Sequence, residues 1–129
     1  LGAEGVQIGT RFALTEESSA SSVFKDYCLS LREGDTKLLL KKLAPTRLVK
    51  NAFREAVEKA EDSGASAEDL RTLLGRGRAK KGIFEGDLEE GELEIGQVSA
   101  IISRRQSVAE VMNELVAAYQ RAAKKDYLF

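Results

Sequence analysis

The chain has no histidine and a single cysteine among its 129 residues. Without histidine, it cannot itself supply a Ser-His-Asp triad, a histidine general base or a histidine-ligated metal. Cys28 alone cannot form an internal disulfide or a zinc site that needs two thiolates. Its 20 Lys and Arg nearly balance its 21 Asp and Glu, and a net charge of -1 gives no overall attraction to nucleic acid or anionic membrane. We therefore expect no metal, no nucleic-acid partner and no membrane partner.

Long apolar runs are also missing. No run approaches the roughly 20 residues that span a bilayer, and no signal peptide is visible, so we expect a cytoplasmic protein. The 43% apolar and 32% charged residues fit one ordinary domain with a single core. The sequence starts at Leu1 and its one methionine is Met112. We expect a processed chain or the back end of a larger enzyme.

The opening residues alternate as a strand does. Val6 and Ile8 lie on one face, Gln7 lies on the other, and Gly9 ends the run, which predicts a strand over residues 5–10. A lone strand has no hydrogen-bonding neighbour, and two remote strands make at best a marginal sheet. This deficit also favours a piece of a larger fold.

The rest of the chain is mainly helical in pattern. The spacing of apolar residues predicts helices over 18–31, 48–61, 67–74, 98–102 and 107–125. Ser66 with Asp69, and Ser107 with Glu110, fit capping boxes. Residues 36–40 fit a short strand. Cys28 is expected to be a buried, inert thiol, and Met112 and Tyr119 are expected in the core rather than against a cofactor.

Residues 75–92 change character and predict an ordered excursion or a long loop. Its first part is basic (Arg76, Arg78, Lys80 and Lys81), and residues 86–92 are acidic. The basic part fits neither the P-loop nor the dinucleotide pattern, and the acidic part lacks the spacing of a calcium loop. Two interpretations stay open. Either the two parts pair with each other at the surface, or the basic residues grip an acidic partner.

Two glycine turns are candidate binding elements. Gly9-Thr10 follows the predicted strand, and a glycine there lets bare N–H groups approach an anion. The alternative is a simple strand-to-loop turn. Gly96-Gln97 opens a predicted helix with free N–H groups and an amide side chain, which suit a cofactor or substrate carbonyl. A packing role is the equal alternative.

Taken together, these segments resemble a known family. Residues 2–12 (GAEGVQIGTRF), followed by residues 15–18 (TEES), look like the last barrel strand and following loop of the FMN-dependent enoyl-acyl-carrier-protein reductase II and nitronate monooxygenase family. Further matches follow in the family's order and approximate spacing: Asp35-Thr36, residues 47–51, Gly86-Asp87 and residues 96–98. The resemblance covers nearly the whole chain.

The resemblance implies an α/β fold. The chain would be the C-terminal part of an FMN-binding (β/α)8 TIM barrel, contributing its last strand, with an appended mainly helical subdomain; taken alone it would be mostly α. The implied divisions are residues 1–34 (last strand, phosphate-binding turn and following helix), 35–106 (inserted helical and loop subdomain) and 107–129 (C-terminal helix).

The resemblance also implies a flavin-dependent oxidoreductase that uses NADH or NADPH to reduce FMN. The reductase branch reduces the 2,3 double bond of an enoyl thioester on acyl carrier protein in fatty acid synthesis, and the other branch oxidises alkyl nitronates with oxygen. Residues 15–18 and the long helical tail favour the reductase branch. We expect a homodimer, and little activity from this chain alone. A third reading is a helical interaction module that never binds flavin.

Four residues are carried over as cofactor-binding. Gly9 and Thr10 match the family's FMN-phosphate turn, with backbone N–H groups as donors, and Gln7 would help to shape that turn. Gln97 matches a family Gly-Gln by type and place only, for a flavin or substrate role. The family's catalytic histidine and the other half of its phosphate site are expected upstream of Leu1, so no catalytic residue is named.

Overall fold

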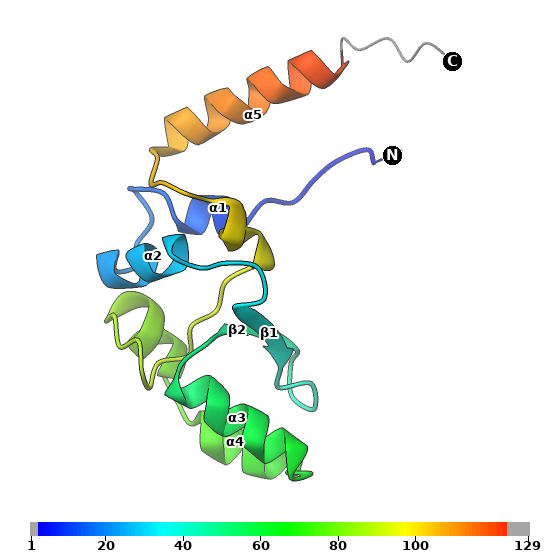
Figure 1. Ribbon diagram of the computed structural model, residues 1–129, viewed down its shortest axis with the longest axis vertical. Helices are drawn as coiled ribbons and strands as arrows, with labels where there is room; N and C mark the ends of the chain where they lie inside the picture. Colours follow the sequence, from blue (N-terminus) through cyan, green and yellow to red (C-terminus); the bar gives the residue numbers. More distant parts are fainter. Residues whose placement is uncertain (1–2, 124–129) are drawn as a thin grey trace.

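The computed structural model describes residues 3–123. Its elements, in chain order, are α1 (Thr10–Ala13), α2 (Ser22–Leu29), β1 (Thr36–Leu39), β2 (Thr46–Val49), α3 (Ala52–Asp62), α4 (Ala67–Leu74), the π-helical turn η1 (Lys80–Phe84), the 3-10 helix η2 (Gln97–Ile101) and α5 (Val108–Ala123). The molecule is elongated, with α3 and α4 at one end and α5 at the other (Figure 1). It is mostly helical, as expected.

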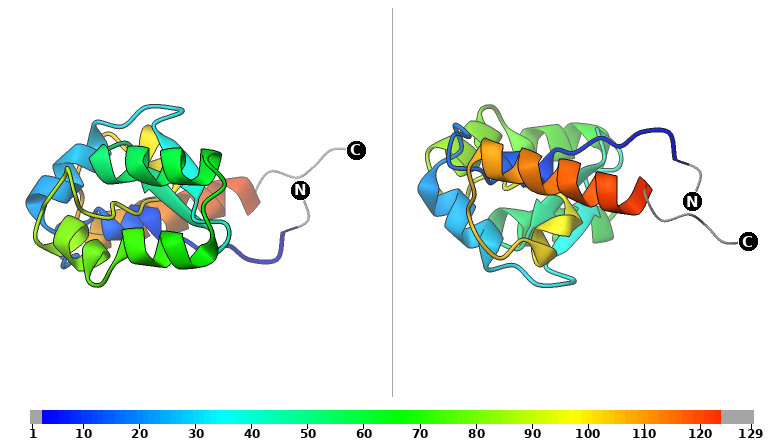
Figure 2. Two further views of the ribbon diagram at one scale, coloured as in Figure 1. Left: turned by 90° about the horizontal axis from the view of Figure 1, so that it is seen from below. Right: turned by 90° about the horizontal axis from the view of Figure 1, so that it is seen from above.

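The segment before α1 has no strand partner among the described residues. Residues 3–9 leave the body on the same side as the end of α5 (Figure 2). Val6 is 82% exposed, and Thr10 is already the first residue of α1. The predicted strand over residues 5–10 is therefore not formed within residues 3–123, because no neighbouring backbone is there to complete a ladder.

The strands β1 and β2 form an antiparallel hairpin, with Thr36 opposite Val49. The prediction of a helix from residue 48 is wrong at its start, because Leu48 and Val49 belong to this hairpin. The Val49 N–H donates to the Leu93 carbonyl at 2.9 Å, which brings a distant segment beside β2. The helix α3 begins only after Asn51, whose side chain accepts from the Arg54 N–H at 2.8 Å.

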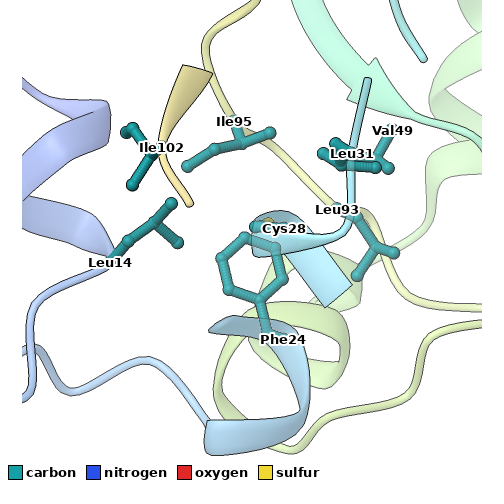
Figure 3. Close-up of a cluster of buried hydrophobic side chains, with 8 residues drawn as sticks. All are labelled: Leu14, Phe24, Cys28, Leu31, Val49, Leu93, Ile95 and Ile102. Carbon is teal, nitrogen blue, oxygen red and sulfur yellow. The ribbon is translucent and has the colours of Figure 1, made fainter. Parts of the chain in front are cut away.

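Two hydrophobic clusters lie on opposite sides of β2. The first contains Leu14, Phe24, Cys28, Leu31, Val49, Leu93, Ile95 and Ile102 (Figure 3). The second contains Leu39, Leu40, Leu48, Phe53, Val57 and Leu70. Leu48 and Val49 fall in different clusters because successive side chains of a strand point to opposite faces. The hairpin thereby connects the α3–α4 pair to the rest of the molecule, so the core has two parts.

Capping residues set the helix starts. The predicted helix over 67–74 is confirmed as α4, with Ser66 and Asp69 in a capping box. The box before α5 is also confirmed, since the Ser107 hydroxyl accepts from the Glu110 N–H at 3.2 Å and Glu110 accepts in return. The helix α2 begins at residue 22 rather than 18, because the Ser21 side chain accepts from the Phe24 N–H.

Two predicted core segments are exposed. In α5 only Val111 is buried, whereas Met112 is 45% and Tyr119 is 74% exposed, so the prediction that these two lie in the core is wrong. The helix α5 contacts α1 and then extends away from the other helices and strands (Figure 1). Residues 98–102 were expected to form a buried helix, but Val98 and Ile101 of η2 are 50% and 83% exposed.

Candidate functional site

The hydroxyl of Thr10 joins the two predicted glycine turns. It accepts a hydrogen bond from the Gly96 N–H at 3.0 Å, across 86 positions of sequence. A Cβ built at Gly96 would lie 2.3 Å from the same hydroxyl oxygen, a separation that real side chains do not tolerate. Glycine is therefore required at position 96 for this approach. The structure thus brings the turn at Gly9-Thr10 against the turn at Gly96-Gln97.

Gly9 borders open space at the start of α1. No atom lies within 4 Å of the position a Cβ would take at Gly9. The first N–H groups of a helix have no partner inside the helix and are available to an acceptor. A hollow of about 330 Å³ opens here, lined by Gln7, Ile8, Gly9, Thr10, Arg11, Val98, Ile101 and Ile102. Three of the four predicted flavin residues therefore line one hollow, which we call the turn hollow.

The fourth predicted residue, Gln97, lies outside the turn hollow. Gln97 lines a neighbouring hollow of about 720 Å³, here called the arginine hollow. Its lining residues come from the segment after α2, the hairpin and η2: Arg32, Glu33, Gly34, Thr36, Arg47, Gln97, Val98, Ala100 and Ile101. Val98 and Ile101 line both hollows, so the structure places Gln97 beside the other three residues rather than among them.

A third hollow, of about 380 Å³, shares lining residues with the other two. Its lining residues are Thr10, Ala13, Arg47, Glu94, Ile95 and Gly96. Because Thr10 also lines the turn hollow and Arg47 also lines the arginine hollow, the three adjoin one another on one face. We call this the hollow face. Neither Arg47 nor Arg32 is predicted from the sequence to be a site residue. The only signal was that Arg47 stands in the matched segment 47–51.

Arg11 ties the turn hollow to α5. Its Nη2 donates to Gln106 Oε1 at 2.7 Å, and its guanidinium forms an ion pair with Glu114. The Gln106 amide also donates to Glu114 at 2.6 Å. These partners lower the pKa of the Glu114 carboxyl, the Gln106 hydrogen bond most of all. The Arg11 charge is therefore compensated within the chain.

Two basic residues of segment 75–82 pair with the acidic stretch at 86–92, which supports the first of the two interpretations. Lys81 lies 3.0 Å from Asp87, and Arg78 lies 3.5 Å from Glu90. Lys80 lies 3.5 Å from Glu85, just before that stretch, and among residues 3–123 Arg76 forms no ion pair. Backbone N–H donation from Glu90 and the contact with Lys81 lower the pKa of Asp87 to about 2. Of the two predicted forms of this segment, the ordered excursion agrees with the structure, because residues 80–84 form η1.

Arg78 is fixed more firmly than its neighbours in that segment. Its guanidinium donates to the carbonyls of Leu73, Leu74 and Glu90 at 3.2, 2.8 and 2.7 Å. It also lies over the Phe53 ring, 4.5 Å from the centroid. Arg78 is therefore a structural residue that connects the end of α4 to the acidic stretch. It is not available to an external partner.

One buried carboxyl lies near the hollow face. Glu92 is 7% exposed, and burial together with the neighbouring Glu94 carboxylate raises the pKa of Glu92 to about 7. Glu94 lines the third hollow, whereas Glu92 lines none of the three.

Across residues 3–123 no three potential ligand side chains gather to hold a metal ion. In the same residues no helix has the length and apolar character needed to cross a membrane.

Comparison with known proteins identifies the family. A family model described as nitronate monooxygenase matches residues 1–118. The chain belongs to the nitronate monooxygenase family. A curated relative, "Probable nitronate monooxygenase" from Bacillus subtilis (strain 168), is 32% identical over 116 residues, which is 89% of this chain and 33% of the relative. This member of the family therefore spans about a third of that relative's length.

Solved structures show the same fold. FabK from Thermotoga maritima superposes with a TM-score of 0.78 at 28% identity, over 96% of this chain and 39% of FabK. A point mutant of the same protein gives 0.75 at 25% identity, over 96% and 37%. The likeness confirms the predicted fold class: the chain is part of a FabK-like TIM-barrel fold and is itself mostly helical. The flavin roles of Gln7, Gly9, Thr10 and Gln97 stay predictions.

Proposed function

We propose that the protein is an FMN-dependent oxidoreductase and that this chain supplies one side of the flavin-phosphate site. Membership of the nitronate monooxygenase family and the FabK-like fold support the flavin. The observation that carries the assignment of residues is the Thr10–Gly96 hydrogen bond beside the open space at Gly9. It holds a glycine turn and the first N–H groups of α1 at the edge of a hollow, which suits a phosphate oxygen.

The residues present fit part of a flavin and not all of it. Gly9 and Thr10 would donate backbone N–H groups to the phosphate, and the Gln7 amide lines the same hollow. Val98 and Ile101 give that hollow an apolar side. When bound, FMN would supply the hydride chemistry, with NADH or NADPH as reductant. The chain contains no histidine, so its own contribution is to hold and orient rather than to transfer protons through an imidazole.

For the substrate, we propose an enoyl thioester carried on acyl carrier protein. The likeness to FabK over 96% of this chain supports this branch of the family, together with residues 15–18. Oxidation of alkyl nitronates with oxygen is the second candidate. It is favoured by the name of the curated relative and by the family model.

A matched pair of variants tests the flavin site. Gly5 and Gly9 both border open space, so a side chain at either causes no collision within the chain. Purified intact protein should show the visible absorption of a flavin. Gly9→Val should lower the bound flavin because the new side chain occupies the phosphate approach, whereas Gly5→Val should retain it. Intact protein that never contains flavin, even after incubation with FMN, would favour the helical interaction module.

Two assays on the same preparation separate the substrates. The first follows NADH or NADPH oxidation with an enoyl thioester on acyl carrier protein. The second follows oxygen consumption with an alkyl nitronate and no nicotinamide nucleotide. The proposal expects turnover in the first assay to exceed that in the second. Turnover in the second assay alone would assign the protein to nitronate oxidation.

A further inference from the structure

Two arginines face the arginine hollow without a carboxylate partner. Arg32 follows α2 and Arg47 lies in β2, and both line this hollow. Five other arginines form ion pairs: Arg11, Arg54, Arg78, Arg104 and Arg105. Among residues 3–123 no carboxylate forms an ion pair with Arg32 or Arg47. The hollow therefore holds two positive groups that the described part of the chain does not neutralise by direct pairing.

Arg47 is held in place by the hairpin. Its Nη1 lies 3.3 Å from Thr36 Oγ1 and 3.5 Å from the Thr36 carbonyl oxygen, and Arg47 itself is half-buried. Both contacts use one nitrogen of a group that has five N–H donors. The remaining donors of the guanidinium are available to a ligand, and the strand pairing of β2 limits how far the side chain's base can move.

The other residues that line the arginine hollow have a different chemistry. Val98 and Ile101 of η2 are exposed apolar side chains, and the Gln97 amide lies beside them. The one carboxylate in the lining is Glu33, on the exposed loop after Arg32. Two guanidinium groups and one carboxylate give the lining of this hollow a net positive charge, and Glu94, which lines the third hollow together with Arg47, does not line this one. The hollow therefore combines cationic groups with apolar side chains.

We propose that the arginine hollow binds the phosphate group of a phosphorylated organic ligand, with Arg32 and Arg47 as the donors. Guanidinium groups match phosphate oxygens in geometry and charge, and such charge-assisted hydrogen bonds are among the strongest in proteins. A volume of about 720 Å³ suits a small organic ligand. Val98 and Ile101 would contact its non-phosphate part. This site is separate from the flavin-phosphate turn at Gly9-Thr10.

The ligand would lie next to the flavin. Val98 and Ile101 also line the turn hollow, so a molecule held at Arg32 and Arg47 extends toward Gly9-Thr10. This step rests on the proposed function, under which two molecules could bring a suitable phosphate group to the arginine hollow. One is the nicotinamide nucleotide that reduces the flavin, and the other is the phosphopantetheine arm that carries the thioester. Both present a phosphate ester on an organic body.

Calorimetric titration of the intact protein tests the site. The probes are NADP⁺, which cannot reduce the flavin, and 4′-phosphopantetheine, which carries the phosphate of the carrier arm without an adenosine group. The test variant is Arg32→Gln with Arg47→Gln, and the control is Arg71→Gln with Arg121→Gln, which removes the same charge at two exposed positions that line none of the three hollows. We expect the test variant to weaken the binding of one probe by about tenfold per arginine, and the control to leave it unchanged.

The probe that loses affinity identifies the source of the phosphate. Loss confined to NADP⁺ assigns the reductant, loss confined to phosphopantetheine assigns the carrier arm, and loss of both supports the site for the phosphate group that the two probes share. Unchanged affinity for both probes, or an equal loss in the control variant, overturns the proposal. Arg32→Gln alone, on an exposed loop, serves as the second variant if the double variant does not fold. Flavin content is measured in parallel: protein without flavin defeats the proposed function, whereas flavin-containing protein with unchanged affinities defeats only this inference.

Discussion

The Thr10 hydroxyl accepts the Gly96 N–H at 3.0 Å and so joins residues that lie 86 positions apart. It is the contact that makes one surface out of two separate glycine turns. The same hydroxyl is 2.3 Å from where a Cβ would stand on Gly96, so each residue restricts what the other can be. We therefore expect the proposed flavin site to depend on this pair.

Thr10→Val should destabilise the protein by about 1–3 kcal/mol, because it keeps the shape of the side chain and leaves the Gly96 N–H without its acceptor. It should also weaken flavin binding, because the turn at Gly9-Thr10 loses its hydrogen bond to Gly96. Thr10→Ser keeps the hydroxyl and should retain both properties. Urea unfolding and the flavin content of the purified protein measure the two effects. If valine and serine variants behave alike, the hydroxyl has no such role.

Gly96→Ala should be strongly destabilising because its methyl group meets the Thr10 hydroxyl. The Thr10→Ala variant lacks that hydroxyl oxygen. Adding Gly96→Ala to it should therefore lower the free energy of unfolding by less than adding Gly96→Ala to the wild type. The difference is the coupling energy of a double-mutant cycle. Thermal unfolding of the four proteins provides it. Simple additivity of the two substitutions would contradict the close approach.

Local signals predicted part of this structure well. The capping boxes at Ser66 and Ser107 placed the starts of α4 and α5, because a cap acts through residues three positions apart. The prediction of a helix from residue 48 was wrong at its start because Val49 fits the apolar spacing of the helix that follows it. In the structure Val49 is a strand residue whose N–H bonds to Leu93, a partner that no local pattern reveals.

The sequence predicted separate elements of the candidate site but not how they come together in space. The turns at Gly9 and Gly96 were singled out individually, but the sequence does not show that they touch. Arg32 and Arg47 stand on the segment after α2 and on the hairpin, so their common hollow exists only through tertiary folding. The exposure of Ile101 is likewise invisible in a pattern that fits a buried helix equally well.

Arg78→Met should lower the free energy of unfolding by about 3 kcal/mol, because three carbonyl groups lose a charged donor and Phe53 loses its cation. Arg76→Met, at an exposed neighbour, should change stability by about 0.5 kcal/mol or less. Denaturant midpoints give the comparison. Equal midpoints for the two variants would mean that Arg78 is not structural.

The second interpretation of the basic segment, in which it grips an acidic partner, can be tested with the proposed acyl carrier protein. Charge reversal at Arg78 would disturb the fold itself, so the test uses reversal at Arg76, Lys80 and Lys81. If the segment steers the carrier, the apparent Michaelis constant for carrier-bound substrate should rise and that for a free thioester analogue should not. Equal changes for both substrates would defeat the idea.

Cys28 should be unreactive in the folded protein. The thiol is fully buried, and burial raises its pKa from 9.0 to about 12, so almost no thiolate forms near neutral pH. A disulfide reagent should therefore label the cysteine only as fast as the protein opens. Adding urea should bring the rate to that of the unfolded chain. Rapid, complete labelling without denaturant would contradict the packing in Figure 3.

Glu92 should make the protein less stable as the pH rises. Its pKa in the folded state is about 7, above the ordinary 4.5, so the folded protein keeps a proton that the unfolded chain has released. Stability then falls between about pH 5 and pH 8, by about 3 kcal/mol for a shift of this size. Glu92→Gln mimics the protonated carboxyl and should remove this decline. Glu55→Gln, at an exposed position on α3, should leave the decline in place.

The neighbouring carboxylate provides a further check on the cause. Glu94→Gln removes the negative charge beside Glu92, which lowers the pKa of Glu92 and moves the decline to lower pH without abolishing it. Urea unfolding of the four proteins across this pH range distinguishes the outcomes. A Glu92→Gln variant that still lost stability in parallel with the wild type would show that another group titrates. A Glu94→Gln variant with an unshifted midpoint would leave burial as the whole cause.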